Sequence, residues 1–354
     1  MTERLRQLRE QLQHLTVDAV LITNPYNRFY LSGFDGSSGV LMISSEKAYL
    51  VTDFRYTEQA AAQAPLFEIV RWQDDLYNSL VPIIVNNGWQ KLGFESKHVV
   101  HFSYGEMNAR LPVELVPLEH TVETQRARKD QQEIATLRQG AAALDQAFEY
   151  VKSVLEPGRT EKEVALALES YLRRQGAEGV PFPFIVASGK RGAMPHGVAS
   201  SKAMGRGELV TIDFGAIFFS YATDMTRTVS LGEPAERQRA VYDVVNLARQ
   251  KATEAVKPGM KGSAVDAVAR EIIGDAGFGE YFGHGLGHGV GLETHEQPVL
   301  NTRSETVLVP GMVVTIEPGI YIPDWGGVRI EDMILVTEQG FEILTRSPHE
   351  LAVI

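Results

Sequence analysis

The sequence contains no cysteine among its 354 residues. That absence excludes disulfide bonds, thiolate nucleophiles and sulfur-ligated metal sites. Long apolar runs are also missing, since none approaches the roughly 20 residues that a membrane-spanning helix needs. The first residues mix acidic and basic side chains and lack the apolar core of a signal or transit peptide. We therefore expect a cytoplasmic protein without a membrane partner.

Positive charge is scarce as well, because 34 lysines and arginines stand against 45 aspartates and glutamates, for a formal net charge of −11. Such an acidic chain is not expected to bind nucleic acid through bulk electrostatics. What is present is an ordinary globular composition, with 44% hydrophobic and 22% charged residues. The length is typical of two domains.

The N-terminal part, residues 1–122, is predicted to be an α/β domain. Leucines at helical spacing open it, and three short β-type runs follow at 18–23, 39–44 and 48–52. Turn signals separate the runs, namely Asn24-Pro25 and the Gly-rich loop 34–39. This loop lacks the lysine and the spacing of a phosphate-binding P-loop, so a plain turn is favoured.

The C-terminal part, residues 123–354, is predicted to be a second domain, joined to the first through the polar stretch Thr121–Lys129. Two nearly identical hexapeptides mark it, Val210–Gly215 (VTIDFG) and Val314–Gly319 (VTIEPG). Each is followed by a second acid, at Asp224 or Glu331, after a similar number of residues. The pairs indicate an internal duplication whose acids meet at the seam between the copies.

The helical patterns repeat with the acids. One apolar pattern runs from Ile134 to Leu155 and ends at Pro157-Gly158, after which Thr160 and Glu163 have the spacing of a capping box. A second pattern runs from Glu236 to Val256, ends at Pro258-Gly259, and is followed by a helix from Ser263 to about Asp275. Each copy is therefore predicted as two helices followed by a β-region that carries acids.

The acids are expected on β-hairpins. On the strand from Asp224 to Leu231, period-two alternation places Asp224 and Thr226 on one face, and a turn brings that face to Asp213. In the second copy a strand from Val328 to Val336 would place Arg329 on the face of Glu331. Four buried carboxylates need compensating positive charge, which two divalent cations would supply. Read singly, each acid would be better interpreted as a solvated turn residue, but two duplicated pairs on predicted core strands reverse this preference and favour a metal site.

A glycine-rich run, His284–His295 (HGLGHGVGLETH), contains three histidines. Period two places His284 and His288 on one strand face and glycines on the other, where a second backbone or a ligand could approach closely. On a straight strand these two histidines would be roughly 13 Å apart at about 3.3 Å per residue. One is therefore expected as a metal ligand and the others in substrate or proton-transfer roles. The remaining histidines outside any motif are expected to be surface or packing residues: His14, His101, His120 and His349.

At these positions the chain resembles the pita-bread metallopeptidases of the prolidase and aminopeptidase P branch. The segments that carry the resemblance are Ile185–Gly189 (IVASG), Met194–Gly197 (MPHG), Asp213–Gly215 (DFG), Thr223–Arg227 (TDMTR), His284–Leu292 (HGLGHGVGL), Glu317–Gly319 (EPG) and Arg329–Asp332 (RIED). The N-terminal segments Asn24–Phe34 and Asp53–Tyr56 resemble the same branch more loosely. The implied fold class is α/β (α+β), with a creatinase-like N-terminal domain for substrate access and dimerisation and a pita-bread catalytic domain with internal pseudo-twofold duplication.

The resemblance also implies the site residues. The metal ligands would be Asp213, Asp224, His288, Glu317 and Glu331, with Asp224 and Glu331 bridging two divalent ions. The outer catalytic set would be His196, His284, His295, Glu317 and Arg329, and the substrate-binding residues would be His196, His295, Tyr321 and Arg329.

The implied reaction is hydrolysis of the Xaa-Pro peptide bond of small peptides. Two cations that share a water would make hydroxide available near neutral pH for attack on the scissile carbonyl. Glu317 would shuttle the proton, while His196 and His295 would stabilise the intermediate. Oxygen-rich ligation with one imidazole suits manganese, cobalt, zinc or iron, and the resemblance favours manganese. It also implies a homodimer.

Several alternatives stay open at this point. An Xaa-Pro dipeptidase is favoured, but an aminopeptidase P that acts on longer Xaa-Pro peptides has the same site. Methionine aminopeptidase shares the five ligands, and a non-catalytic pita-bread binding protein shares the fold. A dipeptidase needs a closed cleft or a cation for the free carboxylate of its substrate, and Arg28 and Arg55 are candidate cations.

Overall fold

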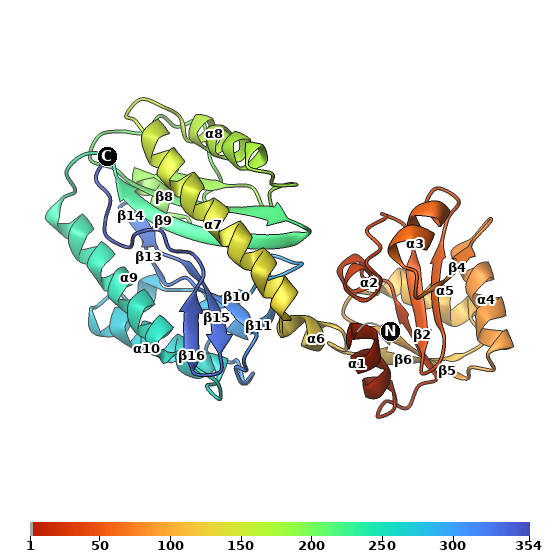
Figure 1. Cartoon of the computed structure of the whole chain (residues 1–354). Helices are drawn as coiled ribbons and strands as arrows, with labels where there is room; N and C mark the ends of the chain where they lie inside the picture. Colours follow the sequence, from red (N-terminus) through yellow and green to blue (C-terminus); the bar gives the residue numbers. More distant parts are fainter. Residues whose placement is uncertain (1–2) are drawn as a thin grey trace. The chain divides into compact units, whose positions relative to one another are not determined.

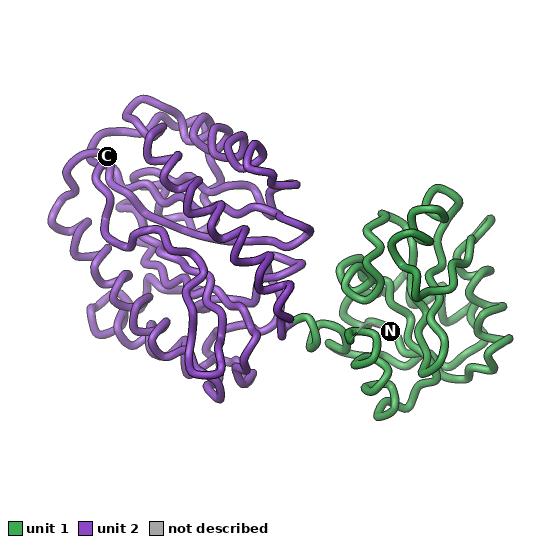
Figure 2. Tube along the Cα trace, viewed as in Figure 1, with its two compact units in different colours: residues 1–126 green, residues 127–354 purple. Residues whose placement is uncertain are grey.

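The computed structural model describes residues 3–354, which form two compact units, one ending at Arg126 and the other beginning at Ala127 (Figure 2). The predicted division after residue 122 lies slightly earlier, within the stretch expected to be a linker. That stretch contains the helix α6 (Glu123–Ala127), so it is structured rather than an extended connection. No helix within residues 3–354 combines the length and apolar character needed to cross a membrane.

The first unit is a six-stranded mixed sheet with the order β4-β3-β2-β1-β5-β6. Its core is formed by residues of these strands with α4 and α5. The strands are β1 (Ala19–Ile22), β2 (Val40–Ser44), β3 (Ala48–Thr52), β4 (Glu68–Arg71), β5 (Lys91–Glu95) and β6 (Glu114–Leu118). The other helices are α1 (Glu3–Leu12), α2 (Pro25–Ser32), α3 (Thr57–Gln63), α4 (Leu76–Asn86) and α5 (His101–Arg110).

The three β-type runs expected in this unit are confirmed as β1, β2 and β3, but the interpretation of Asn24-Pro25 as a turn is wrong. These residues begin the helix α2. The Asn24 side chain accepts hydrogen bonds from the backbone N–H groups of Tyr26 and Asn27, and Pro25 occupies the first helical position. Proline fits there because its missing N–H would have no helical partner.

The second unit contains four long helices and three small sheets. The helices are α7 (Gln131–Val154), α8 (Glu161–Arg174), α9 (Glu236–Ala255) and α10 (Gly262–Asp275). The strands are β7 (Ile185–Ser188), β8 (Leu209–Phe218), β9 (Tyr221–Ser230), β10 (Gly287–Gly289), β11 (Glu296–Leu300), β12 (Val313–Ile316), β13 (Gly319–Ile322), β14 (Gly326–Arg329), β15 (Asp332–Thr337) and β16 (Gly340–Ile343). Their orders are β7-β8-β9, β13-β14 and β11-β10-β12-β15-β16.

The predicted duplication corresponds to two half-domains with separate cores. In the first half, α7 and α8 pack against β7, β8 and β9, whereas in the second half α9 and α10 pack against strands of β11 to β14 (Figure 1). One apolar cluster lies mainly in the first half and another mainly in the second. The predicted start of α8 is confirmed, since Thr160 and Glu163 form the expected capping box.

Candidate metal centre

The first half supplies two acids from one continuous hairpin. The strands β8 and β9 pair along their entire length, so that Asp213 lies opposite Thr226 and Asp224 lies opposite Gly215. Cross-strand and diagonal neighbours of this kind share a face of the sheet. The predicted placement of Asp224 and Thr226 on one face, turned toward Asp213, agrees with this register.

The second half supplies two acids from a hairpin that is interrupted in the middle. The strand β12 pairs with β15 up to Ile316 opposite Asp332, and β13 pairs with β14 from Gly319 opposite Arg329. The acids Glu317 and Glu331 lie in the gap between these two ladders. The prediction of one strand from Val328 to Val336 is therefore wrong.

Proline explains part of the interruption, because Pro318 has no N–H to donate to a ladder. The N–H groups of the two acids instead donate to other segments, Glu317 to the carbonyl of Leu286 at 2.8 Å and Glu331 to the carbonyl of Thr226 at 3.0 Å. The second bond joins the two half-domains directly beside the acids.

The histidine run is strand only over Gly287–Gly289, so the prediction of a longer strand is wrong. The interpretation of its glycines is confirmed. A Cβ at Gly287 would lie 2.0 Å from the Thr315 carbonyl oxygen, and one at Gly289 would lie 2.2 Å from that of Gln297. Neighbouring strands thus approach so closely that only glycine fits, and this packing holds His288 between β11 and β12.

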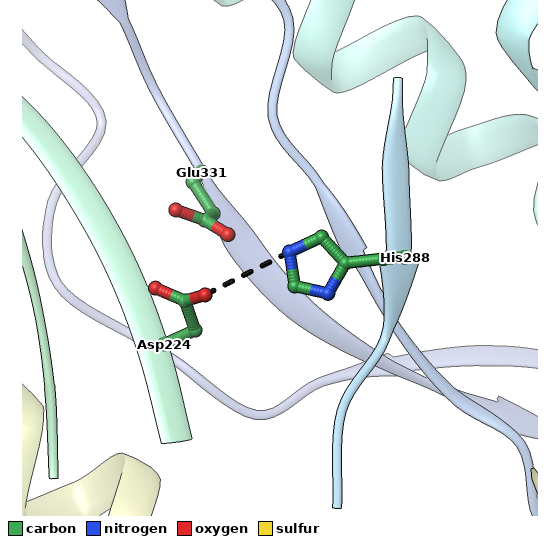
Figure 3. Close-up of side chains that lie close together, drawn as sticks. All are labelled: Asp224, His288 and Glu331. Atoms are coloured by element: carbon green, nitrogen blue, oxygen red, sulfur yellow. Dashed lines mark ion pairs between the residues drawn. The ribbon is translucent and has the colours of Figure 1, made fainter. Parts of the chain in front are cut away.

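His288, Asp224 and Glu331 converge in the interior of the second unit (Figure 3). Each offers one ligand atom, and these atoms lie within 4.8 Å of one another. The His288 Nε2 atom is 3.8 Å from Asp224 Oδ2 and 3.3 Å from Glu317 Oε1. Its Nδ1 atom lies 3.1 Å from the Gly289 carbonyl oxygen, which can only accept, so Nδ1 carries the proton and Nε2 offers a lone pair to the acids.

The acids are not fully satisfied by the protein. Within residues 3–354, the buried side-chain atoms without a hydrogen-bond partner include Asp213 Oδ1, Asp224 Oδ1 and Glu331 Oε1. Buried polar atoms are nearly always paired in folded proteins, so three unpaired carboxylate oxygens at one point need an explanation. Their hard oxygen character and the imidazole lone pair match the donors that divalent cations such as manganese accept.

Burial and mutual repulsion dominate the electrostatics of the cluster. Burial, with Asp213 and Glu317 nearby, raises the pKa of Asp224 well above its ordinary value, and burial with Asp224 does the same for Glu331. Burial raises the pKa of Glu317 to about 8, although Arg329 opposes the shift. Burial and the neighbouring His295 lower the pKa of His288 to about 4, so its imidazole is neutral at pH 7. A neutral imidazole is the form that binds a metal.

Arg329 is a buried cation in direct contact with one of the acids. Its Nη2 atom donates to Asp213 Oδ2 at 2.6 Å, and its Nη1 atom donates to the Tyr321 hydroxyl at 2.9 Å and to the Pro195 carbonyl at 3.1 Å. Burial opposes its charge, yet Tyr321 and Asp213 raise the pKa of Arg329 above its ordinary value. The guanidinium therefore stays charged and ties the segment before His196 to the acids.

Tyr321 links Arg329 to His284. The tyrosine hydroxyl lies 2.9 Å from His284 Nε2, and His284 Nδ1 lies 2.7 Å from the carbonyl oxygen of Gly285. Because that carbonyl can only accept, Nδ1 carries the proton and Nε2 accepts from the tyrosine. His284 and His288 thus have separate partners, as their spacing in the sequence suggested.

His196 and His295 are exposed, in contrast to the buried acids. His295 lies beside His288 with ring centroids 4.2 Å apart. Burial also lowers the pKa of His295, and the proximity of His196 contributes to that shift. Asp224 and Glu331 keep only 4% and 2% of their residue surface exposed, while the Glu317 side chain keeps 18%. The acids therefore lie at the buried side of the cluster, and His196 and His295 lie at its solvent-accessible side.

Two threonines that sequence reasoning did not single out as site residues orient the acids. The Thr226 hydroxyl donates to Glu331 Oε2 at 2.7 Å and accepts from Arg329 Nε at 3.2 Å. The Thr315 hydroxyl donates to Glu317 Oε1 at 3.3 Å and accepts from the His288 N–H at 3.0 Å. A signal for both existed in the sequence, because each lies two residues from an acid in a β-type pattern whose alternation puts the two side chains on one face.

The sequence matches two family models, Metallopeptidase family M24 over residues 135–338 and Creatinase/Prolidase N-terminal domain over residues 4–128. An Xaa-Pro dipeptidase of Pyrococcus horikoshii is 39% identical over 357 residues, which cover 99% of each chain. An Xaa-Pro dipeptidase structure from Bacillus anthracis has a TM-score of 0.97 and 44% identity, with 99% of both chains covered.

A third similar structure, an X-Pro aminopeptidase from Thermotoga maritima, has a TM-score of 0.92 and 37% identity and again covers 99% of both chains. These matches confirm the predicted combination of a creatinase-like N-terminal domain and a pita-bread C-terminal domain. The chain belongs to metallopeptidase family M24, with a creatinase/prolidase N-terminal domain.

Proposed function

We propose that this metallopeptidase hydrolyses the peptide bond before proline with two divalent cations, and we favour an Xaa-Pro dipeptidase. One observation carries the proposal. His288 lies close to the buried carboxylates of Asp224 and Glu331, and each of these carboxylates has one oxygen without a hydrogen-bond partner in the described part of the chain. The dipeptidase names of the relatives from P. horikoshii and B. anthracis support the choice of substrate.

The proposed ligands are Asp213, Asp224, His288, Glu317 and Glu331. The raised pKa values of three of these acids support the assignment, because bound cations would supply the charge that favours their ionised forms. When bound, the two cations would lower the pKa of a shared water and polarise the scissile carbonyl. Manganese is favoured among the metals that suit such a donor set.

The surrounding residues have separate roles in this proposal. The Glu317 side chain keeps 18% of its surface exposed, so it can reach the attacking water, take its proton and pass that proton to the leaving proline nitrogen. His196 and His295 donate to the tetrahedral intermediate from the exposed side of the cluster. Arg329 and Tyr321, joined to His284, fix Asp213 and the substrate-facing segment before His196.

The cation that would select a free substrate carboxylate is not Arg28 in its present position. The Arg28 side chain is buried in the first unit and donates to the carbonyls of Gly36 and Gly39. Arg55 is half exposed and forms a bidentate pair with Asp53. Arg55 therefore remains the proposed candidate of the two.

The likeness to an X-Pro aminopeptidase favours aminopeptidase P as the second candidate function. The test compares hydrolysis of Ala-Pro, Ala-Pro-Ala and Ala-Ala by the purified chain after chelation and after manganese is restored. Hydrolysis of Ala-Pro alone supports the dipeptidase, and hydrolysis of Ala-Pro-Ala supports aminopeptidase P. Full activity in the presence of chelator, or in an Asp213→Asn variant, contradicts the proposed centre.

We further propose that the protein works in the cytoplasm as a homodimer on small Xaa-Pro peptides. The acidic net charge of −11 supports a role away from nucleic acid and anionic membranes. Light scattering coupled to size-exclusion chromatography tests the dimer, and a monomer at micromolar concentration contradicts it.

A further inference from the structure

A buried charged cluster lies directly behind Glu331. The next residue, Asp332, is fully buried and accepts hydrogen bonds from two arginines, a histidine and a threonine. The donors are Arg227 Nη2 at 2.8 Å, Arg249 Nη1 at 2.9 Å, His349 Nε2 at 2.8 Å and Thr345 Oγ1 at 3.0 Å. We call these five residues the Asp332 network. Its members come from β9, α9, β15 and the C-terminal segment 344–354.

Arg227 connects the Asp332 network to the acid cluster. Its Nη1 atom donates to the carbonyl oxygens of Glu331 and Thr226. Thr226 in turn accepts the N–H of Glu331 on its carbonyl and donates its hydroxyl to Glu331 Oε2. The main chain and the carboxylate of Glu331 are thus both held by groups that Arg227 positions.

The C-terminal segment completes this arrangement. Besides His349 and Thr345, it offers the carbonyls of Ser347 and Pro348 to Arg227. It is anchored in turn to both half-domains. Asp145 on α7 accepts the N–H groups of Arg346 and Ser347, Tyr242 on α9 donates to the His349 carbonyl, and Ser230 on β9 pairs with Ala352 and Ile354.

A contribution to the stability of the fold does not by itself explain why these charged residues are buried together. Arg227 and Asp332 keep at most 1% of their side chains exposed, and Arg249 keeps 6%. Buried ion pairs of this kind are often no more stabilising than well-packed apolar residues of the same size, because removing charges from water is costly. What a fully bonded charged network does provide is a fixed position, and Glu331 needs one because it is packed against the like charges of Asp224 and Glu317.

We propose that the C-terminal segment, through His349, Asp332 and Arg227, positions Glu331 for divalent-cation binding. His349 and Arg227 are positioning residues in this proposal, since Arg227 contacts the main chain of Glu331 and His349 contacts Asp332. The inference rests on the proposed function only in taking Glu331 as a metal ligand.

The experiment measures manganese affinity of the metal-free full-length chain by competition with a fluorescent chelator. His349→Ala removes the Nε2 donor to Asp332, and we expect the affinity to fall about 10-fold or more, as for outer partners of metal ligands generally. His349→Gln keeps a donor at that reach and should restore most of the affinity. Arg346→Gln is the matched control in the same segment, because the Arg346 side chain is 75% exposed, and it should bind manganese like the wild type.

The outcomes separate this inference from the proposed centre. Loss of manganese binding in Glu331→Gln together with wild-type affinity in a folded His349→Ala overturns the positioning role and leaves the centre intact. Wild-type affinity in Glu331→Gln overturns both. If His349→Ala does not fold, Arg249→Gln, which removes another donor to Asp332, serves in its place. Wild-type affinity in a folded Arg249→Gln then overturns the proposal.

Discussion

The two acid-bearing hairpins of the second unit contain nearly the same hexapeptide, but their strands pair differently. The hairpin of β8 and β9 is continuous, and simple alternation brings Asp213 and Asp224 to one face. The hairpin of β12 to β15 is interrupted around Pro318, and Glu317 and Glu331 lie in the interruption. Duplication thus accounts for four acids, but only the interrupted copy frees the Glu331 N–H to bond Thr226 of the other half.

The largest expected effects come from removing one buried acid of each hairpin. Asp224→Asn and Glu331→Gln keep the size of the side chain and remove its charge. Each should reduce manganese-dependent Xaa-Pro hydrolysis by more than the roughly 100-fold that loss of an outer partner costs. Steady-state kinetics at saturating manganese checks this. Near wild-type activity of either variant would show that the acid it replaces is not a metal ligand.

A smaller effect is expected from the Thr226 hydroxyl, which links the first hairpin to the Glu331 carboxylate of the second. Thr226→Val preserves shape but removes the hydroxyl that donates to Glu331 Oε2. Manganese affinity should fall by about 10- to 100-fold, as for other outer partners of metal ligands. Thr211→Val is the matched control, since that buried hydroxyl bonds to the Thr228 hydroxyl across the first hairpin rather than to an acid. Equal manganese affinities in the two variants would show that the bond from the Thr226 hydroxyl to Glu331 does not contribute to metal binding.

The second half-domain also contributes His284 to the surroundings of the acids, whereas the hairpin of β8 and β9 contains no histidine. Burial lowers the pKa of His284 from 6.5 to about 4. Because the folded pKa lies below the unfolded one, the neutral imidazole stabilises the fold above pH 6.5, and this contribution is lost as the pH falls toward 4. The loss should reach about 1.4 kcal/mol per pH unit.

The measurement compares the free energy of unfolding of the wild type and of His284→Gln between neutral pH and about pH 4. The difference between the two proteins should shrink as the pH falls, and an NMR titration should place the protonation midpoint of His284 near 4. A midpoint near 6.5 would mean that the ring is not held as described.

The smallest effect is expected at the proline of the interrupted hairpin. Pro318→Ala restores an N–H, but the bonds of Glu317 to Leu286 and of Glu331 to Thr226 should still hold the interruption open. The free energy of unfolding should fall by only about 0.4–1 kcal/mol, from the greater freedom of the unfolded chain. Urea denaturation measures it. Loss of manganese binding would show instead that the proline alone maintains the interruption.

The same contrast explains what the sequence could predict. The hexapeptides, the capping box of Thr160 and Glu163, and the period-two faces are local signals, so the duplication, the helices and the meeting of the acids were predictable. The interruption beside Glu331 was not, because it depends on a carbonyl of β9 that lies about a hundred residues earlier in the chain.

Two other features escaped for related reasons. Asn24-Pro25 is compatible with a turn and with a helix start, and only the N–H groups of Tyr26 and Asn27 decide between them. His349 belongs to no motif, and its contact with Asp332 appears only when the C-terminal segment folds back onto α9 and β9. The four acids were predictable from the duplicated hexapeptides, whereas the choice of His288 among the three histidines of the glycine-rich run came from family resemblance.

The most direct test of the central claim is an anomalous-scattering experiment on crystals of the chain grown with manganese. We predict two manganese peaks per chain, both between the two hairpins and in contact with the proposed ligands Asp213, Asp224, His288, Glu317 and Glu331. A single peak, or peaks bound outside this group of residues, would contradict it.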